Sequence, residues 1–452
     1  MDELDKLRET ILDSETFCFY PFLEVSTRPN GAVFPCCYWN DLNDRGFKDE
    51  QRISDDNTIR TFWNNDLVQR VRTDIASEKK VGGCSTCYRD GKSSMRQRSI
   101  KEYSNDRDKL QLVKDTLDNN SIATHTPIKL ELKPSNLCNL KCLICNSYDS
   151  SQIEKEFTAL SKDSGIETKG GSFFRKIDKP GIWEAGFPLE QVSKADWAES
   201  AKFWKEVEMF LPKIEVLSFA GGEPTLNPVV HKIIEYCVTN DYAKNIKVFV
   251  SSNFTNLNAK FLKSMSHFKQ FELIASIDAV GEVQEYSRFP SNWKQIQKNF
   301  EEAKQYMKHD NIKILVNATV SIFNIFEIHK LLWYIDEQSK LYPYYKEWPF
   351  NINLLAYPPH QEITIIPEKF RKPIINELQN YIDNSTMIKQ FPELQIKIDL
   401  LINQLLTPCN NNDSIEKLNL LRDSLDVLDK HRGVSYKVSI PQLDQIFKDT
   451  LV

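Results

Sequence analysis

The feature that most constrains how this chain folds is an alternation of apolar, β-rich runs with amphipathic helical stretches, from about residue 127 to residue 360. Short apolar runs suit buried strands, and the segments between them have helical periodicity. Strands separated by helices favour the α/β class, with a parallel sheet wound in βαβ units. Active residues then gather at the carboxyl ends of the strands. The expected strands are residues 128–133, 215–219, 246–251, 272–277, 312–320 and 350–356, and the expected helices include 229–238, 259–267, 293–307 and 325–337.

Three cysteines follow the first expected strand closely, in the sequence Cys138-Asn-Leu-Lys-Cys142-Leu-Ile-Cys145. A tetrahedral zinc ion or a fully protein-ligated iron–sulfur cluster normally takes four protein ligands. Three thiolates with no fourth cysteine or histidine close by indicate a cluster with one open iron. Because an open iron can bind a substrate or cofactor directly, the pattern predicts a chemical rather than a structural site.

A second motif ends the second expected strand, in Val216-Leu-Ser-Phe-Ala-Gly221-Gly222-Glu223-Pro224. Glycines let the backbone approach a ligand closely, and a carboxylate at a strand tip can hold an ammonium group. Alone, a Gly-Gly-Glu sequence after a strand is usually a turn. Together with the three-cysteine loop, the motif indicates a ligand-binding site rather than a simple turn.

The two motifs together resemble those of the radical S-adenosylmethionine (radical SAM) enzymes. The resemblance covers roughly residues 125 to 360 and implies a partial (β/α)6 barrel of the TIM type. It also implies that Cys138, Cys142 and Cys145 hold a [4Fe-4S] cluster whose fourth iron is chelated by the methionine part of S-adenosylmethionine. The glycine-rich motif would bind the amino group of the same cofactor. One departure from the family is Ile144, where an aromatic residue is common.

Polar residues at the other strand ends are candidates for the cofactor pocket implied by the resemblance. Asp278, close after Ser276, would accept from the ribose hydroxyls, since a carboxylate is a natural partner for a diol. Arg288 would pair with the methionine carboxylate. Each candidate also has an ordinary alternative as a turn or cap residue. The further candidates for the ribose or adenine edge are Ser252, Asn253, Asn317 and Thr319.

A second group of cysteines precedes the expected barrel and ends in Cys84-Ser-Thr-Cys87. A C-x-x-C pair alone fits a zinc knuckle, a redox pair or half of a cluster site. Cys18 is followed after twelve residues by Gly31, and after four more by Cys36. This spacing resembles the auxiliary-cluster modules, of twitch or SPASM type, that usually follow the barrel in radical SAM enzymes. Here the cysteines precede it, and the later cysteines of the longer SPASM form are absent.

The resemblance implies one auxiliary [4Fe-4S] cluster, with Cys18, Cys36, Cys84 and Cys87 as its ligands. Cys37 stands next to Cys36 and could replace it, although Cys36 is favoured. A structural zinc site remains the alternative, because four thiolates suit both metals. In the basic stretch after Cys87, Arg96 or Arg98 either lies in a solvated turn or approaches the cluster or substrate.

Three domains are expected: residues 1–124 with the auxiliary cluster, 125–360 as the barrel and 361–452 as a helical C-terminal extension with a linker at 407–414. An insertion at 165–188 is either a packed surface excursion or a flap over the barrel mouth. The net charge of −5 and the pI near 5.9 argue against a nucleic-acid partner. No apolar run approaches the roughly 18 residues needed to cross a membrane. Two tight cysteine groups suit metal binding in a reducing cytoplasm better than disulfides.

The family resemblance implies an oxidoreductase that cleaves S-adenosylmethionine reductively. The resulting 5′-deoxyadenosyl radical would abstract a hydrogen atom from an unactivated substrate carbon, and the auxiliary cluster would accept the substrate electron. An external one-electron reductant such as flavodoxin or ferredoxin is then required. A peptide or protein substrate is favoured. The alternatives are a dehydrogenase or epimerase of a sugar, aminocyclitol or other small metabolite, and a non-catalytic iron–sulfur electron carrier.

Overall fold

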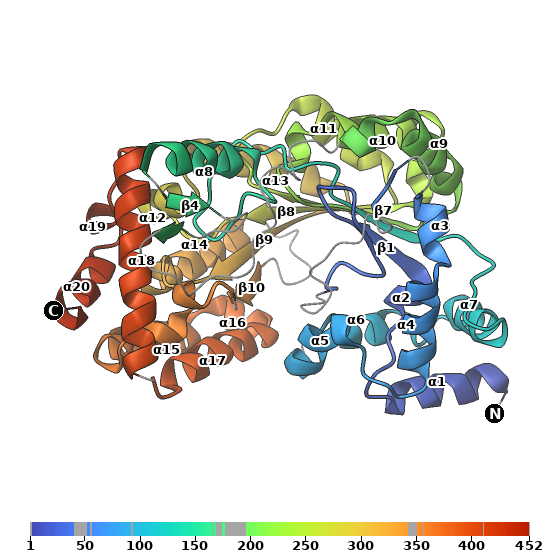
Figure 1. Ribbon diagram of the computed structural model, residues 1–452, viewed down its shortest axis with the longest axis horizontal. Coiled ribbons are helices and arrows are strands. Elements are labelled where there is room, and N and C mark those ends of the chain that lie inside the picture. The colour runs from blue at the N-terminus through green and yellow to red at the C-terminus, as the bar shows by residue number, and fades with distance from the viewer. Residues whose placement is uncertain are drawn as a thin grey trace. The chain divides into compact units, whose positions relative to one another are not determined.

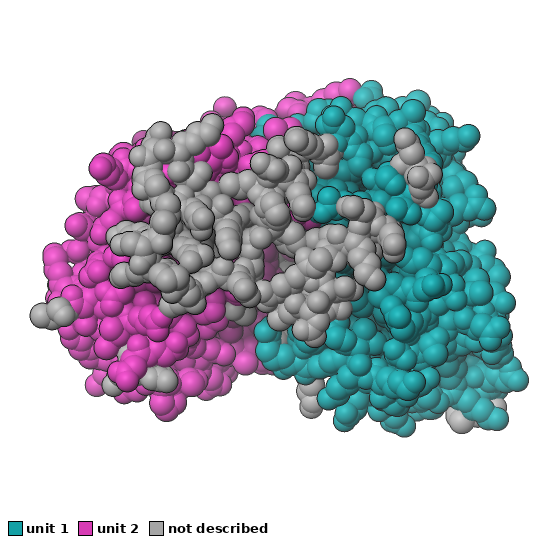
Figure 2. Space-filling view, viewed as in Figure 1, with its two compact units in different colours: residues 1–136, 191–249, 267–269 teal, residues 137–190, 250–266, 270–452 magenta. Residues whose placement is uncertain are grey.

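The computed structural model describes two compact units, shown in different colours in Figure 2. Unit 1 comprises residues 1–136, 191–249 and 267–269, and unit 2 comprises residues 137–190, 250–266 and 270–452. The described residues are 2–39, 52–54, 57–91, 94–164, 166–168, 174–176, 196–341, 350–355, 357–409 and 411–451.

The strands of unit 1 lie in the order β2-β1-β3-β6, of which Figure 1 labels β1. β1 pairs in parallel with β3, and β3 with β6, whereas β2 is antiparallel to β1. The register of the first pair places Glu24 opposite Lys129. β7 contributes residues to both units. The bounds are β1 (Glu24–Thr27), β2 (Val33–Phe34), β3 (Lys129–Leu132), β6 (Val216–Phe219) and β7 (Lys247–Ser252).

In unit 2, the parallel strands β8 (Gln270–Ser276), β9 (Ile312–Val320) and β10 (Phe350–Leu354) lie side by side. Alternate residues of β8 and β9 are buried, which is the period-two pattern of strands with one face packed against a core. The other face carries polar side chains such as Asn317. A separate antiparallel pair joins β4 (Ile166–Thr168) to β5 (Phe174–Lys176).

Helices make up most of the remaining described structure. The helices of unit 1 are α1 (Glu3–Asp13), α2 (Tyr20–Leu23), α3 (Ile59–Trp63), α4 (Asp66–Ala76), α5 (Ser85–Asp90), α6 (Met95–Tyr103), α7 (Arg107–Asp118), α9 (Ala201–Phe210) and α10 (Pro228–Thr239). Those of unit 2 are α8 (Ser151–Ser164), α11 (Ala259–Ser264), α12 (Gly281–Ser287), α13 (Trp293–Lys304), α14 (Ile328–Leu341), α15 (Arg371–Asn384), α16 (Thr386–Gln390), α17 (Glu393–Leu406), α18 (Asn411–Arg432), α19 (Tyr436–Ser439) and α20 (Pro441–Thr450). Short 3-10 turns that position the sites are η2 (Gly82–Cys84), η7 (Pro224–Leu226) and η12 (Pro359–Gln361).

The six predicted strands are confirmed as β3, β6, β7, β8, β9 and β10. The four predicted helical segments correspond to α10, α11, α13 and α14. The α/β class with parallel pairing is therefore confirmed. Closure of the strands into a partial barrel, an N-terminal cluster domain and the boundaries after residues 124 and 360 stay predictions.

The structure differs from the sequence-based predictions at the linker and at β1, and it leaves the predicted insertion untested. The predicted linker at 407–414 is too long, because α18 begins at Asn411. β1 was not predicted, since a four-residue Glu-Val-Ser-Thr run has too little apolar character to stand out. Apart from β4 and β5, most of the 165–188 insertion lies outside the described residues. Among the helices that the structure describes, none combines the length and apolar character needed to span a membrane.

Candidate functional site

The three cysteines of the first motif lie on a loop before α8, residues 138–145, called here the cysteine loop. Its backbone is held in two places. Lys141 N donates to Phe289 O at 2.6 Å, and Leu143 N donates to Ser287 O at 2.8 Å. These two bonds fix the peptides on either side of Cys142, so its side chain has a defined direction.

Side-chain amides anchor the same loop. Asn253, directly after β7, donates from Nδ2 to Oδ1 of Asn139 at 2.9 Å, and Asn139 donates from Nδ2 to Oγ1 of Thr255 at 2.8 Å. The Oδ1 atom of Asn253 also accepts from Thr255 N at 3.0 Å. Gln361, in η12, donates to Leu143 O at 3.2 Å. Asn253 was predicted as a cofactor contact, and in the structure its side chain contacts the cysteine loop.

Cys142 and Cys145 border a cavity of about 360 Å³ inside unit 2. Burial raises the pKa of both thiols, and Asp149 raises that of Cys145 further. Arg288 and Arg432 act against burial at Cys142, because a nearby guanidinium stabilises a thiolate. Buried thiols facing positive charge fit an anionic iron–sulfur cluster. The other lining residues come chiefly from α8, η12 and α18: Leu143, Ile153, Phe157, Phe323, His360, Gln361, Leu421, Ser424, Leu425, Leu428 and Arg432.

Asp278 and Arg288 form a bidentate ion pair. Arg288 Nε lies 2.6 Å from Asp278 Oδ2, and Nη2 lies 3.0 Å from Oδ1. Thr319 N donates to the same Oδ1 at 2.8 Å. Burial lowers the pKa of Arg288 and Asp278 raises it, with a net rise. The structure thus brings together two residues that were predicted to bind different parts of the cofactor. Their pairing fixes the guanidinium plane, as a bidentate fork requires.

The remaining strand-end candidates of unit 2 have their own partners. Ser252 is buried, and its Oγ accepts from Phe254 N at 3.1 Å. Ser276 and Asn317 are register neighbours on β8 and β9. Asn317 Oδ1 accepts from the amides of Asn351 and Asn353, both at 2.8 Å.

In unit 1, the glycine-rich motif forms the tip of β6. Gly221 and Gly222 have φ values of 73° and 56°, in the left-handed region that favours glycine. A Cβ atom on Gly221 would lie 2.8 Å from the Cβ of Lys133. Glu223 is 1% exposed, and its Oε1 accepts from Thr225 N at 3.1 Å and from Thr225 Oγ1 at 2.6 Å. Pro224 begins η7. These two hydrogen bonds fix the carboxylate at the strand tip, and its contact with a cofactor stays a prediction.

The match to known families falls on this part of the chain. Residues 132–321, which contain the cysteine loop and the glycine-rich motif, match the family model described as the radical SAM superfamily. This segment is similar to the radical SAM superfamily. The family implies S-adenosylmethionine and a [4Fe-4S] cluster, and the buried thiols beside two guanidinium groups fit such a cluster.

Solved structures of radical SAM enzymes are among those similar to the chain. Streptococcus suis SuiB bound to S-adenosylmethionine shares 14% identity over 66% of this chain and 55% of SuiB, with a TM-score of 0.34. AnSMEcpe with bound AdoMet shares 18% identity over 57% of this chain and 61% of that protein, with a TM-score of 0.36. SuiB bound to the precursor peptide SuiA gives a TM-score of 0.34 at 14% identity, covering 66% of this chain and 56% of that protein. The chain thus spans little more than half of SuiB, and TM-scores this low carry no argument about substrate. No curated protein sequence matches the chain.

Outside the radical SAM segment, the four predicted auxiliary ligands line one cavity of about 410 Å³ in unit 1. Burial raises the pKa of Cys18 to about 11 and that of Cys84 to about 12, and it raises the pKa of Cys36 well above the usual value. Neighbouring cysteines raise these three pKa values further, as Cys87 does for Cys18. Four thiols that line one cavity and whose charges repel one another fit a cationic metal centre. The remaining lining residues are Thr16, Tyr20, Pro21, Tyr38, Trp39, Gly83, Met95 and Arg96.

Four short elements bring these cysteines together. Cys18 precedes α2, Cys36 follows β2, Cys84 ends η2 and Cys87 lies in α5. Close packing holds η2 in place, because a Cβ on Gly83 would lie 2.3 Å from the Trp39 ring.

Arg96 is the residue of the basic stretch that reaches this cavity. It is buried, and its Nη1 donates to Ser14 O at 3.1 Å. The structure therefore places it beside the cysteines rather than in a solvated turn.

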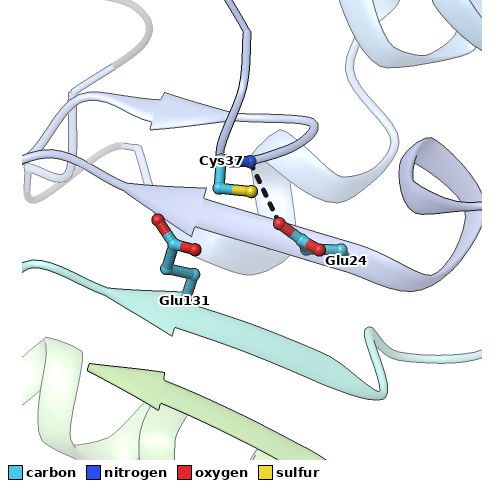
Figure 3. Close-up of side chains that lie close together, drawn as sticks. All are labelled: Glu24, Cys37 and Glu131. Atoms are coloured by element: carbon cyan, nitrogen blue, oxygen red, sulfur yellow. Dashed lines mark hydrogen bonds between the residues drawn. The ribbon is translucent and has the colours of Figure 1, made fainter. Parts of the chain in front are cut away.

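Cys37 lies near Glu24 and Glu131, as Figure 3 shows, whereas Cys36 lines the cavity. Its thiol and carboxylate oxygens of Glu24 and Glu131 lie within 4.8 Å of one another. Cys37 N donates to Glu24 Oε1 at 3.0 Å. Lys129 Nζ lies 2.7 Å from Glu24 Oε2. Burial raises the pKa of Cys37 well above its usual value, and Glu24 raises it further.

Several residues that hold the cysteine loop or line its cavity were not predicted from the sequence. Asn139 lies between two of the cysteines, and its position in the motif is the one signal that could have identified it. Gln361 and Arg432 reach the cysteine loop and its cavity from far along the chain, and no local pattern marks them. All ten cysteines fall within the described residues, and none forms a disulfide.

Proposed function

We propose that the protein is a radical SAM oxidoreductase in which Cys138, Cys142 and Cys145 hold a [4Fe-4S] cluster that binds S-adenosylmethionine. The observation that carries the proposal is the anchored loop of buried thiols within the segment that matches the superfamily. With an electron from an external reductant such as flavodoxin or ferredoxin, the bound group supplies a 5′-deoxyadenosyl radical, which abstracts a hydrogen atom from an unactivated substrate carbon.

The protein's own residues orient the reactants and exclude water. Asn253 holds the cysteine loop through Asn139, and the apolar side chains of α18 close the cavity beside Cys142. Arg288, held by Asp278, presents positive charge toward the cluster. The proposed cofactor contacts are Gly221, Gly222, Glu223 and Pro224 for the amino group, with Ser252, Asn253, Ser276, Asp278, Arg288, Asn317 and Thr319 around the rest of the molecule.

We further propose one auxiliary [4Fe-4S] cluster on Cys18, Cys36, Cys84 and Cys87. Its support is the single cavity that these four side chains line. With four thiolate ligands the cluster has no open iron, so electron transfer is the role left to it. The substrate radical would lose one electron to this site and one proton to a base, which gives a product oxidised by two electrons overall.

A peptide or protein is the proposed substrate class, on the basis of the resemblance to auxiliary-cluster enzymes. A dehydrogenase or epimerase acting on a sugar, aminocyclitol or other small metabolite is the alternative. A non-catalytic electron carrier is disfavoured, because a carrier has no need of the glycine-rich motif at the tip of β6.

The test is anaerobic reconstitution with iron and sulfide, reduction, and measurement of 5′-deoxyadenosine and methionine. We expect about eight irons per chain, from two four-iron clusters, and slow cofactor cleavage without substrate. Cys142→Ala should abolish cleavage, whereas Cys409→Ala, which changes a cysteine outside both groups, should not. Failure of the wild-type protein to form deoxyadenosine would leave the carrier function in its place.

A further inference from the structure

Two adjacent cysteines of unit 1 face different surroundings. Cys36 lines the cavity with Cys18, Cys84 and Cys87, while Cys37 lies against Glu24 and Glu131. The two thiols are chemically equivalent, and both belong to the same short turn after β2. Something in the surrounding structure must therefore decide which of them enters the cavity.

The peptide of Cys37 is held on both of its edges. Its N–H donates to Glu24 Oε1 at 3.0 Å, and its carbonyl accepts from Arg28 Nη2 at 2.9 Å. Glu24 lies in β1 and Arg28 directly after it, so one strand supplies both contacts. Exchanging the two cysteines would require the turn to rotate, which would break a buried hydrogen bond to a charged acceptor. Such bonds are among the stronger ones in proteins.

Glu24 is itself held in place from the neighbouring strand. It is 0% exposed, and Lys129, its register partner on β3, lies 2.7 Å from Oε2. The Lys129 ammonium also sits 4.2 Å from the centre of the Tyr20 ring, and Tyr20 lines the cysteine cavity. Glu24 therefore accepts a hydrogen bond at Oε1 and forms an ion pair at Oε2. This argues against a separate cation site among Glu24, Cys37 and Glu131.

We propose that Glu24 is the positioning residue that selects Cys36, rather than Cys37, as the fourth thiolate of the metal centre in unit 1. The inference rests on the proposed function only in requiring that a four-thiolate centre forms there. Its distinctive consequence is that bound metal slows the alkylation of Cys36, whereas Cys37, an unligated thiol, labels at the same rate with and without metal.

The experiment uses the full chain with Cys138→Ala, Cys142→Ala and Cys145→Ala, so that the unit 1 centre is measured alone. Metal content, the electron paramagnetic resonance signal of the reduced protein and iodoacetamide labelling of each cysteine by mass spectrometry are recorded. In Glu24→Ala we expect Cys36 to react about tenfold faster or more, as loss of one hydrogen bond to a charged group predicts. Glu24→Gln, whose amide oxygen can still accept from Cys37 N, should restore protection.

Glu131→Gln is the matched control, because Glu131 lies in the same cluster, yet the bond to Cys37 N is made by Glu24. It should keep the wild-type labelling pattern. If Glu24→Ala fails to fold by circular dichroism, Arg28→Met tests the other edge of the same peptide and should also expose Cys36. Wild-type protection of Cys36 in folded Glu24→Ala and Arg28→Met proteins would overturn the proposal, as would slower labelling of Cys37 in the metal-loaded than in the metal-free wild-type protein.

The same measurements test the auxiliary cluster independently of the selection of Cys36 by Glu24. About one zinc per chain with Cys36 protected would remove the redox role of the centre but support selection by Glu24. Four irons with both cysteines equally reactive would support the auxiliary cluster and overturn the selection. Absence of any bound metal would overturn both.

Discussion

Asn253, directly after β7, donates a hydrogen bond from its side-chain amide to Oδ1 of Asn139, 2.9 Å away in the cysteine loop. Asn139 in turn donates a hydrogen bond to Thr255 Oγ1, and the N–H of Thr255 donates to Asn253 Oδ1. The three residues thus form a ring of hydrogen bonds. A residue expected to touch the cofactor is thus a support for the loop that would hold the cluster.

This ring leads to the first prediction. Asn253→Ala should lower the iron content of the unit 2 site, because Asn139 loses its donor and the loop gains freedom; a buried hydrogen bond of this kind is worth about 1–3 kcal/mol. Iron analysis and thermal unfolding of the apo protein are the measurements. Thr255→Val should act similarly, and the double variant should cost less than the sum of the two changes, because both residues belong to one network. Strict additivity would contradict the network.

A second prediction concerns the glycine-rich motif. Glu223→Ala should weaken S-adenosylmethionine binding by about 1.5–3 kcal/mol, if the carboxylate makes one charge-assisted hydrogen bond to the cofactor amino group. Anaerobic calorimetry measures the change in Kd. Asp241→Ala, which removes an exposed carboxylate of the same unit, is the control. An unchanged Kd in Glu223→Ala would remove the residue from the pocket.

A third prediction separates the two cysteine groups. Cys84→Ala should lose the unit 1 cluster and retain about four irons at Cys138, Cys142 and Cys145. Deoxyadenosine should still form with substrate present, while the oxidised product should fall steeply because the electron acceptor is missing. Circular dichroism must accompany the assay, since a metal site can contribute to folding. Wild-type product formation by a folded variant without the cluster would contradict the acceptor role.

A fourth prediction concerns the ion pair between Glu156 and Arg432, whose two contacts measure 3.0 Å and 2.7 Å. Burial raises the pKa of Glu156, but Arg432 and Lys141 together lower it, so the net direction is down. The pair therefore stabilises the fold above the ordinary carboxylate pKa of about 4.3, and this stabilisation is lost as the pH falls below it.

Urea unfolding between pH 7 and pH 3 tests this. The wild-type protein should lose stability toward low pH more steeply than Glu156→Gln. Arg432→Met should cost about 3–5 kcal/mol near neutral pH, because it leaves a buried carboxylate without its main partner. Glu3→Gln, which changes an exposed carboxylate, is the control. Parallel pH profiles for wild type and Glu156→Gln would argue against the pair.

The sequence predicts those parts of the fold and of the candidate site that depend on neighbouring residues, and it does not predict contacts between residues far apart in the chain. The cysteine loop, the Gly221–Gly222 turn and the six strands are local patterns, and the structure contains the loop, the turn and the strands at those positions. The placement of Cys18 and Cys36 beside Cys84 and Cys87 followed from spacing that resembles a known module. Gln361 reaches Leu143 across 218 residues and Arg432 reaches Glu156 across 276, and no periodicity or motif encodes such contacts.

Helix α18 has a consequence for how the protein matures. Its leucines and Arg432 form part of the wall of the cavity that borders Cys142 and Cys145, close to α8 in Figure 1. A ribosome completes the cysteine loop long before it reaches α18. The nascent chain therefore carries its three thiols without this wall, and in the finished chain α18 stands beside Cys142 and Cys145. We expect iron added before α18 folds to reach these two thiols by a wider route than iron added to the completed fold.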